Sequence, residues 1–197
     1  MKKFPFTKQF DAMDCGPACL SMVTRFHGKH YSIQKLRQMS FITREGVSML
    51  GISDAAEAIG MRTMGVKLSF DKLEKEAMLP CIVHWKQNHF VVLYKIKNEK
   101  VYVADPGHGL VTYTKEEFLN FWISTRKDNE DQGVCLLLEP TPGFYKHEDE
   151  KLNKTGFKFL FSYLKPYKKF LVQLFLGLLL GSLLQLIFPF LTQAIVD

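Results

Sequence analysis

The feature that most constrains this chain is an uncharged apolar stretch near its C-terminal end, FLVQLFLGLLLGSLLQLIFPFLTQAIV (residues 170–196). It is 27 residues long, and a helix needs only about 20 apolar residues to cross the hydrocarbon core of a bilayer. Residues 1–140 instead mix charged and apolar side chains, as a water-exposed domain does. The sequence therefore predicts one domain of ordinary size followed by a membrane-spanning helix over residues 168–197.

The excess positive charge lies beside this stretch. Residues 1–140 hold 19 basic and 16 acidic residues, whereas residues 141–169 hold seven lysines and three acidic residues. Lysines that flank a span favour the cytoplasmic side of a membrane, and the N-terminus has no apolar run typical of a secretory signal. We therefore expect a cytoplasmic domain. No basic helix or aromatic RNA-binding signature precedes residue 141, so nucleic acid is not expected as a partner.

Hydrophobic spacing in residues 1–140 predicts an α+β domain, with a helical first half and an antiparallel sheet in the second half. Helices are expected over residues 14–26, 33–39 and 49–59, the last two with Ser32 and Ser48 as N-caps. Further along, β-branched and aromatic runs separated by turn residues predict strands. These expected strands cover residues 61–67, 81–85, 89–96, 100–105, 110–113 and 134–139.

Three segments connect or follow these elements. Thr114 and Glu117 predict a capping box for a helix over residues 115–122, and residues 124–132 are predicted to form a polar loop. Residues 141–155 are predicted to be a linker. Residues 156–167 interleave aromatic residues with lysines, as in a helix at a membrane surface; the alternative is an extension of the span, broken at Pro166.

The four cysteines are not expected to form disulfides, because a cytoplasmic domain keeps its thiols reduced. Cys15 and Cys19 precede His27 and His30, but this spacing is too tight for a zinc finger, so no metal site is predicted. Cys81, Cys135 and His84 lie in strand-like runs and are interpreted as core residues.

Cys15 is a candidate nucleophile because it stands at the start of a predicted helix. A thiol attacks as thiolate, and the positive end of a helix dipole and a nearby histidine both favour that anion. Gln9, six residues upstream, could donate to an oxyanion. His89 opens one strand and Asp105 ends the next, so a base and a carboxylate that orients it fall on neighbouring strands.

The register of the two strands decides whether His89 and Asp105 can contact each other. A two-residue turn at Asn98 and Glu99 would put Asp105 three positions from the residue opposite His89. That odd offset places the two side chains on opposite faces of the sheet. A contact between them therefore requires a bulge that shifts the register by one residue.

Three long motifs carry a resemblance: QFDAMDCGPACLSMV (9–23), PCIVHWKQNHFVVLY (80–94) and VYVADPGHG (101–109). Together they resemble the signature blocks of the papain-like peptidase domain that heads bacterial peptide-exporting ABC transporters. The resemblance covers residues 1–140, and the PFLTQAIVD segment is similar to the first span of the exporter's transmembrane domain. It implies that Cys15 is the nucleophile, His89 the general base, Asp105 the orienting carboxylate and Gln9 the oxyanion-hole donor.

The resemblance also implies a function: a cysteine endopeptidase of the bacterial cytoplasmic membrane that removes a leader peptide after a Gly-Gly pair. The implied partners are the leader-bearing precursor, the membrane and the remainder of a homodimeric ABC exporter, whose missing C-terminal part would bind ATP; residues 1–197 themselves require no cofactor. Two alternatives stay open. One is a catalytically silent module that docks the precursor; the other is a papain-like acyltransferase or amidase.

Overall fold

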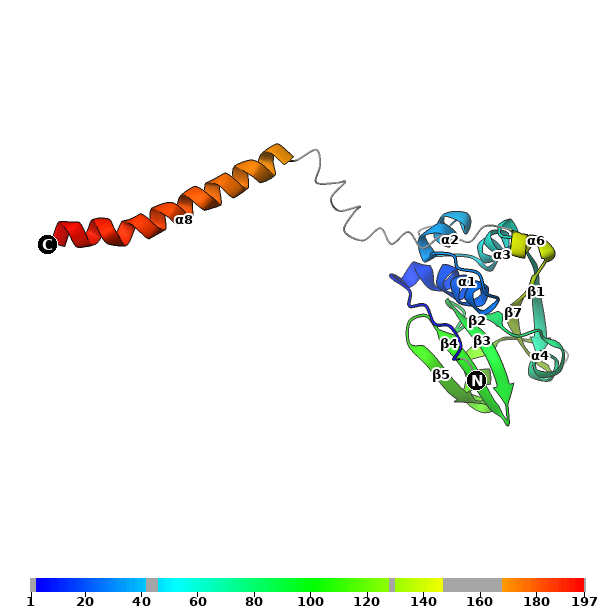
Figure 1. Ribbon diagram of the computed structural model, residues 1–197. Helices are drawn as coiled ribbons and strands as arrows, with labels where there is room; N and C mark the ends of the chain where they lie inside the picture. Colours follow the sequence, from blue (N-terminus) through cyan, green and yellow to red (C-terminus); the bar gives the residue numbers. More distant parts are fainter. Residues whose placement is uncertain (1–2, 42–45, 128–129, 147–167, 197) are drawn as a thin grey trace. The chain divides into compact units, whose positions relative to one another are not determined.

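The structure is a computed structural model that describes residues 3–41, 46–127, 130–146 and 168–196. The chain divides into two compact units, Met1–Lys151 and Leu152–Asp197. The first contains a mixed helix and sheet domain, and the second contains one long helix, α8 (Lys168–Val196). Figure 1 shows the elements of each unit.

The first half of the domain is helical, as predicted. Its elements are the 3-10 helix η1 (Ala12–Asp14), α1 (Cys15–Phe26), α2 (Ile33–Met39) and α3 (Met49–Ala58). The expected N-caps are present: Ser32 Oγ accepts from the backbone N–H of Lys35, and Ser48 Oγ accepts from that of Gly51. The helical half therefore follows from local caps and hydrophobic spacing.

The second half is an antiparallel sheet in the order β1-β7-β2-β3-β4-β5, with β6 paired to β7. The strands are β1 (Met61–Ser69), β2 (Cys81–Trp85), β3 (His89–Lys97), β4 (Lys100–Asp105), β5 (Gly109–Thr114), β6 (Ile123–Lys127) and β7 (Glu130–Pro140). Two helices lie between them, α4 (Phe70–Glu76) and α5 (Lys115–Trp122), the latter with the predicted capping box. The α+β prediction of a helical half followed by an antiparallel sheet is confirmed.

The predicted polar loop at residues 124–132 is wrong, because most of this segment belongs to the β6–β7 hairpin. Arg126 lies opposite Asp131, and their side chains form an ion pair with an Nε to Oδ1 distance of 3.3 Å. Both side chains are largely exposed. Backbone pairing makes this hairpin, and an exposed charged strand carries little of the apolar alternation that predicts strands from sequence.

The domain also extends beyond residue 140, into the segment predicted as a linker. Helix α6 (Pro142–Lys146) follows β7, and its Phe144 side chain is fully buried. Thr141 Oγ1 donates to the carbonyl oxygen of Gly60 over 2.5 Å, which anchors this end of the chain. The rest of the predicted linker and the predicted membrane-surface helix over residues 156–167 lie outside the described residues.

Two apolar cores hold the domain together, one associated with the α1–α3 helices and the other with α4 and α5. The first contains Leu20, Met22 and Ile52, together with Val92 of β3. The second contains Phe118 and Trp122 of α5 with strand residues such as Trp85. Helix α1 packs against β3, so the start of α1 and the start of β3 belong to one rigid framework.

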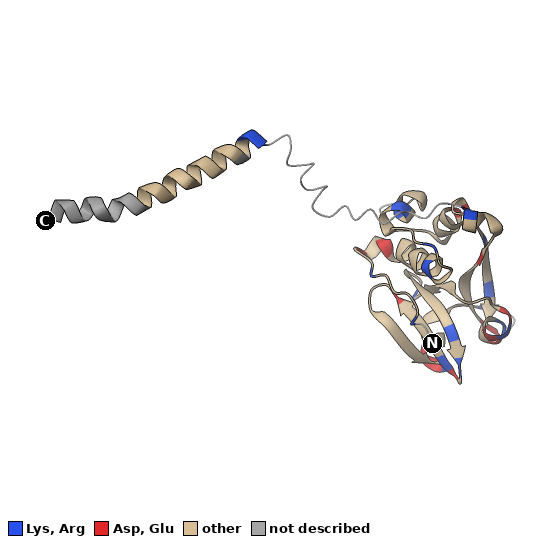
Figure 2. Cartoon of the chain, viewed as in Figure 1, with Lys and Arg blue, Asp and Glu red and all other residues tan. Residues whose placement is uncertain are grey.

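Helix α8 is apolar on all sides and is long and apolar enough to cross a membrane. Its charged residues within the described part are Lys168 and Lys169 at its start, and the remaining described length is uncharged (Figure 2).

Candidate active site

Cys15 is the first residue of α1, directly after the η1 turn. Asp11 Oδ1 caps this turn by accepting from the backbone N–H of Met13 over 2.8 Å. The first N–H groups of an α-helix have no acceptor within the helix, so they and the helix dipole favour negative charge at this point. Cys15 is 5% exposed, so its side chain is almost fully buried at this point.

A bulge in β3 brings His89 and Asp105 onto one face of the sheet. Lys97 pairs with Lys100 across the two-residue turn, but the register shifts between Leu93 and Lys95, leaving Tyr94 as the extra residue. This is the one-residue shift that the sequence required for a contact. His89 Nε2 donates a hydrogen bond to Asp105 Oδ1 over 2.9 Å.

The Asp105 carboxylate is buried and accepts from three groups. His89 Nε2 and the backbone N–H of Gly107 bond to Oδ1 at 2.9 and 2.8 Å, and His108 Nδ1 bonds to Oδ2 at 2.9 Å. Burial alone would raise the pKa of Asp105, but these hydrogen bonds outweigh it and lower the pKa to about 2. Asp105 is therefore held as a carboxylate.

His89 connects this carboxylate to the thiol. Burial alone would lower its pKa, but hydrogen bonds with Asp105 and with the Cys15 side chain outweigh that effect and raise the pKa to about 9. Because Nε2 is bonded to Asp105, Nδ1 is the ring nitrogen left to face the thiol. The site thus has a thiol, an imidazole and a carboxylate in a row, which is an arrangement suited to nucleophilic catalysis.

Gln9 lies next to the turn that follows Asp105. Its backbone N–H donates to the carbonyl oxygen of Pro106 over 3.1 Å. Its side-chain Oε1 is buried and has no hydrogen-bond partner among the described residues. Oε1 can only accept a hydrogen bond, so the Nε2 group of the same carboxamide is the one that could donate to an oxyanion.

The structure also brings close to the site two residues that the sequence did not assign to it. His108 holds the second oxygen of Asp105, although its side chain is 79% exposed. Cys19, one helical turn after Cys15, donates from Sγ to the carbonyl oxygen of Phe90 over 3.2 Å, and burial raises its pKa well above the ordinary value. The only sequence signal for either residue was its position within a motif that carries a catalytic candidate.

A pocket of about 460 Å³ is lined in part by residues close in sequence to His89, but not by Cys15, His89, Asp105 or Gln9 themselves. Its lining includes Asn88 and Phe90, the two neighbours of His89, and Val47, which lies so close to Gly16 that a Cβ there would overlap it. His84, interpreted from sequence as a core residue, is half-buried and lines the same pocket. Within the described residues, no group of three or more His, Cys, Asp or Glu side chains is arranged to hold a metal ion.

A family model described as the peptidase C39 family matches residues 3–143, which include all of these groups. The chain belongs to the peptidase C39 family. Among its curated relatives is the colicin V secretion/processing ATP-binding protein CvaB of Escherichia coli, 28% identical over 196 residues that cover 100% of this chain and 26% of that protein. The lactococcin-G-processing and transport ATP-binding protein LagD of Lactococcus lactis subsp. lactis is 35% identical over 145 residues, which cover 71% of this chain and 19% of that protein. The chain thus spans about a quarter or less of these relatives.

Solved C39 structures share the fold. A double glycine motif protease from an AMS/PCAT transporter, crystallised in complex with its leader peptide, is 35% identical with a TM-score of 0.62, covering 71% of this chain and 93% of that one. The peptidase domain of Streptococcus ComA, a bi-functional ABC transporter involved in a quorum sensing pathway, is 29% identical with a TM-score of 0.60. The match covers 71% of this chain and 100% of that one. The resemblance found from the three sequence motifs is confirmed.

Proposed function

We propose that this C39 domain is an active cysteine endopeptidase that removes the leader of a peptide precursor after a Gly-Gly pair. In this proposal Cys15 is the nucleophile, His89 the general base and Asp105 the carboxylate that orients it, while Gln9 donates to the oxyanion. The single observation that carries it is the row of Cys15, His89 and Asp105: His89 Nε2 lies 2.9 Å from Asp105 Oδ1, and the Cys15 side chain is among the groups that raise the pKa of His89. A silent docking module would have no need for a base held in this way.

The reaction starts from a thiolate and an imidazolium. The Cys15 thiolate attacks the carbonyl carbon of the second glycine, and the carbonyl oxygen becomes an oxyanion, which the Gln9 carboxamide and the free N–H groups of the first turn of α1 stabilise. The His89 imidazolium gives its proton to the leaving nitrogen as the peptide bond breaks, leaving the leader as a thioester. Water then loses a proton to His89 and hydrolyses the thioester, which restores the starting pair.

In this proposal the substrate cleft near Cys15 selects glycine by excluding side chains at the two residues before the cut. A side chain that meets a rigid wall suffers overlap, which discriminates more strongly than the loss of a favourable contact. A glycine pair offers little binding area, so affinity comes from the upstream leader, docked as an amphipathic helix with apolar residues at i, i+3 or i+4 spacing. The names of the relatives, which combine processing with transport, support a precursor as substrate.

The domain acts beside an exporter in this proposal. Helix α8 is the first span of a homodimeric ABC exporter in the bacterial cytoplasmic membrane, with the peptidase on the cytoplasmic side and ATP bound by a part of the exporter outside residues 1–197. Attachment to the pore raises the local concentration of the processed peptide at its exit route. The uncharged length of α8 after Lys168 and Lys169 supports a span whose basic end is cytoplasmic.

The test is to incubate residues 1–151 with double-glycine precursors encoded near the gene and to identify the cleavage site by mass spectrometry. We expect one cut after the second glycine, no cut with Cys15→Ala, and unchanged precursor binding by that variant. A precursor with valine in place of either glycine should bind but stay uncut. Precursor binding without any cutting by the wild-type protein would support the docking module instead, and turnover of small amides alone would support an amidase.

A further inference from the structure

A buried carboxylate directly precedes the proposed nucleophile. Asp14 is 1% exposed and is the N-cap residue of α1, yet its side chain makes no capping hydrogen bond. Its Oδ2 atom is buried and has no hydrogen-bond partner among the described residues. A negative charge in this position opposes the formation of a second one on the adjacent thiol, since like charges disfavour each other's ionised form.

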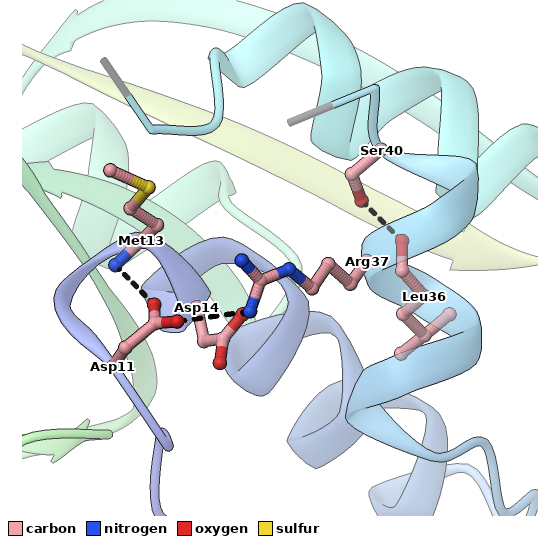
Figure 3. Close-up of polar contacts among 6 residues, drawn as sticks. All are labelled: Asp11, Met13, Asp14, Leu36, Arg37 and Ser40. Atoms are coloured by element: carbon pink, nitrogen blue, oxygen red, sulfur yellow. Dashed lines mark hydrogen bonds and ion pairs between the residues drawn. The ribbon is translucent and has the colours of Figure 1, made fainter. Parts of the chain in front are cut away.

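Arg37 of α2 supplies the opposite charge. Its Nη1 atom lies 3.0 Å from Asp14 Oδ1 and 3.0 Å from Asp11 Oδ2, so one guanidinium bridges both carboxylates (Figure 3). Asp11 uses its other oxygen to cap η1 through Met13. The bridge therefore connects α2 to both ends of the turn that leads into Cys15.

The ion pairs of Arg37 with Asp11 and with Asp14 differ in how strongly they stabilise the structure. Asp11 is half exposed, and an ion pair between solvent-exposed groups contributes little. Asp14 is almost completely buried, and removing the partner of a buried charge leaves that charge uncompensated. The contact with Asp14 is therefore the one that matters for the site.

We propose that Arg37 is a positioning residue of this peptidase, which neutralises Asp14 and fixes the η1 turn so that Cys15 can form its thiolate at the N-terminus of α1. This inference rests on the proposed role of Cys15 as the nucleophile. The other titratable groups close to Cys15 are His89 and Asp105 of the sheet and Cys19 on the next turn of α1. None of them contacts Arg37 in the described interactions, so a change at Arg37 acts through the carboxylates.

The test measures the alkylation rate of Cys15 by iodoacetamide as a function of pH, with the modified residue identified by mass spectrometry, alongside kcat and KM for a double-glycine precursor. In Arg37→Met we expect alkylation at pH 7 to fall about tenfold and the pH profile to move about one unit to the alkaline side. We expect kcat to fall with it and KM to stay unchanged, because Arg37 is not placed to bind the leader.

Three further variants distinguish the loss of the Arg37 charge from a general effect of the substitution on folding. Arg37→Lys keeps a cation and should stay within about threefold of the wild-type alkylation rate, because one unit of charge is retained. Asp14→Asn combined with Arg37→Met removes both charges and should bring the alkylation rate of Cys15 back close to the wild-type rate. Arg126→Met, which removes an exposed ion pair with Asp131 on the β6–β7 hairpin, is the matched control and should leave the profile unchanged.

Wild-type alkylation in Arg37→Met over the whole pH range would overturn the inference, and so would a double variant that reacts no faster than Arg37→Met. If Arg37→Met does not fold, the double variant is compared with the wild type instead, and an alkylation rate about tenfold below wild type in that variant would overturn the inference. Failure of the wild-type protein to cut any precursor would instead count against the proposed function, because the alkylation profile does not depend on a substrate.

Discussion

Asp105 divides its two carboxylate oxygens between two histidines. His89 takes Oδ1 and His108 takes Oδ2, so the carboxylate has no freedom to rotate away from the base. This fixed carboxylate favours the protonated form of His89, whose pKa is about 9. At the residue scale the site is therefore set to hold an imidazolium at neutral pH, as a thiolate nucleophile requires.

The first prediction concerns pH. Cleavage should decline as the pH rises through about 9, because His89 then loses the proton that it must give to the leaving nitrogen. In Asp105→Asn the carboxylate charge is lost, so the alkaline limb of kcat/KM should move toward the ordinary histidine pKa of 6.5. The measurement is kcat/KM against pH for both proteins.

The same shift has a consequence for stability. The folded-state pKa of His89 is raised above 6.5, so its pair with Asp105 stabilises the fold fully below about pH 6.5 and this contribution is lost as the pH rises through about 9. Arg126→Met, which removes an exposed ion pair with Asp131 on the β6–β7 hairpin, is the control for both readouts. An alkaline limb at the same pH in the wild type and in Asp105→Asn would contradict the assignment of Asp105.

The second prediction concerns Gln9, whose Nε2 group is proposed to donate to the oxyanion. Gln9→Ala should lower kcat by about 10²–10³ with little change in KM, because the bond forms only as the oxyanion develops. Steady-state kinetics on one precursor gives both values, with Lys8→Ala, a change at an exposed neighbour, as the control. A rise in KM at constant kcat would move Gln9 from catalysis to binding.

At the scale of elements, the extra residue in β3 decides the geometry of the site. Tyr94 occupies the bulge, and its ring stacks on Phe4 with centroids 4.4 Å apart, so the N-terminal segment packs over the irregular point of the sheet. Beyond the bulge, Val92 lies opposite Ala104, which puts His89 and Asp105 on the same face. A local irregularity thus aligns groups from two strands, as bulges near active sites commonly do.

The third prediction concerns the contact between α5 and β7. Trp122 is almost fully buried, and a Cβ at Gly133 would overlap its indole ring, which is also fixed by a hydrogen bond from Nε1 to the carbonyl oxygen of Val134. Gly133→Ala should therefore lower the free energy of unfolding by about 1–3 kcal/mol through overpacking. Chemical denaturation of residues 1–151 measures this value.

A matched control lies in the same sheet. Gly65 of β1 has open space where its Cβ would be, with Met49 Sδ at 4.0 Å as the nearest atom, so Gly65→Ala should cost no stability. If the two substitutions had equal effects, the loss at Gly133 would be due to backbone conformation rather than to the overlap with Trp122.

At the scale of the whole molecule, the chain consists of two units that expose different kinds of surface. The first buries its apolar side chains in two cores, whereas the described residues of α8 expose theirs along the helix. Exposed leucines on every side of a helix are stable in lipid and not in water.

The fourth prediction follows from this difference. Residues 1–151 should stay soluble and keep their cleavage activity, while the full chain should float with phospholipid vesicles in a density gradient. Leu179→Lys combined with Leu183→Lys places two charges within α8 and should abolish flotation, because a charged side chain in the bilayer interior is costly. Flotation of residues 1–151, or of the double variant at the wild-type level, would contradict a spanning role for α8.

The sequence by itself determined the local features of this protein. The start of α1 at Cys15, the caps at Ser32 and Ser48, the capping box of α5 and the turn at Asn98 and Glu99 all follow from neighbouring residues. Their signals come from backbone geometry and hydrophobic period, which act over only a few positions along the chain. Cys15, His89 and Asp105 could be named for the same reason, since each lies at the start or end of a predictable element.

The tertiary structure decided how these elements meet. The bulge at Tyr94, the β6–β7 hairpin, the burial of Phe144 and the bridge from Arg37 to Asp14 depend on residues that are far apart in sequence or that pair through their backbones. Strand register and side-chain contacts of this kind are selected by the packing of the whole domain. Local pattern therefore named the residues of the candidate site, but only the packing of the domain could set the distances between them.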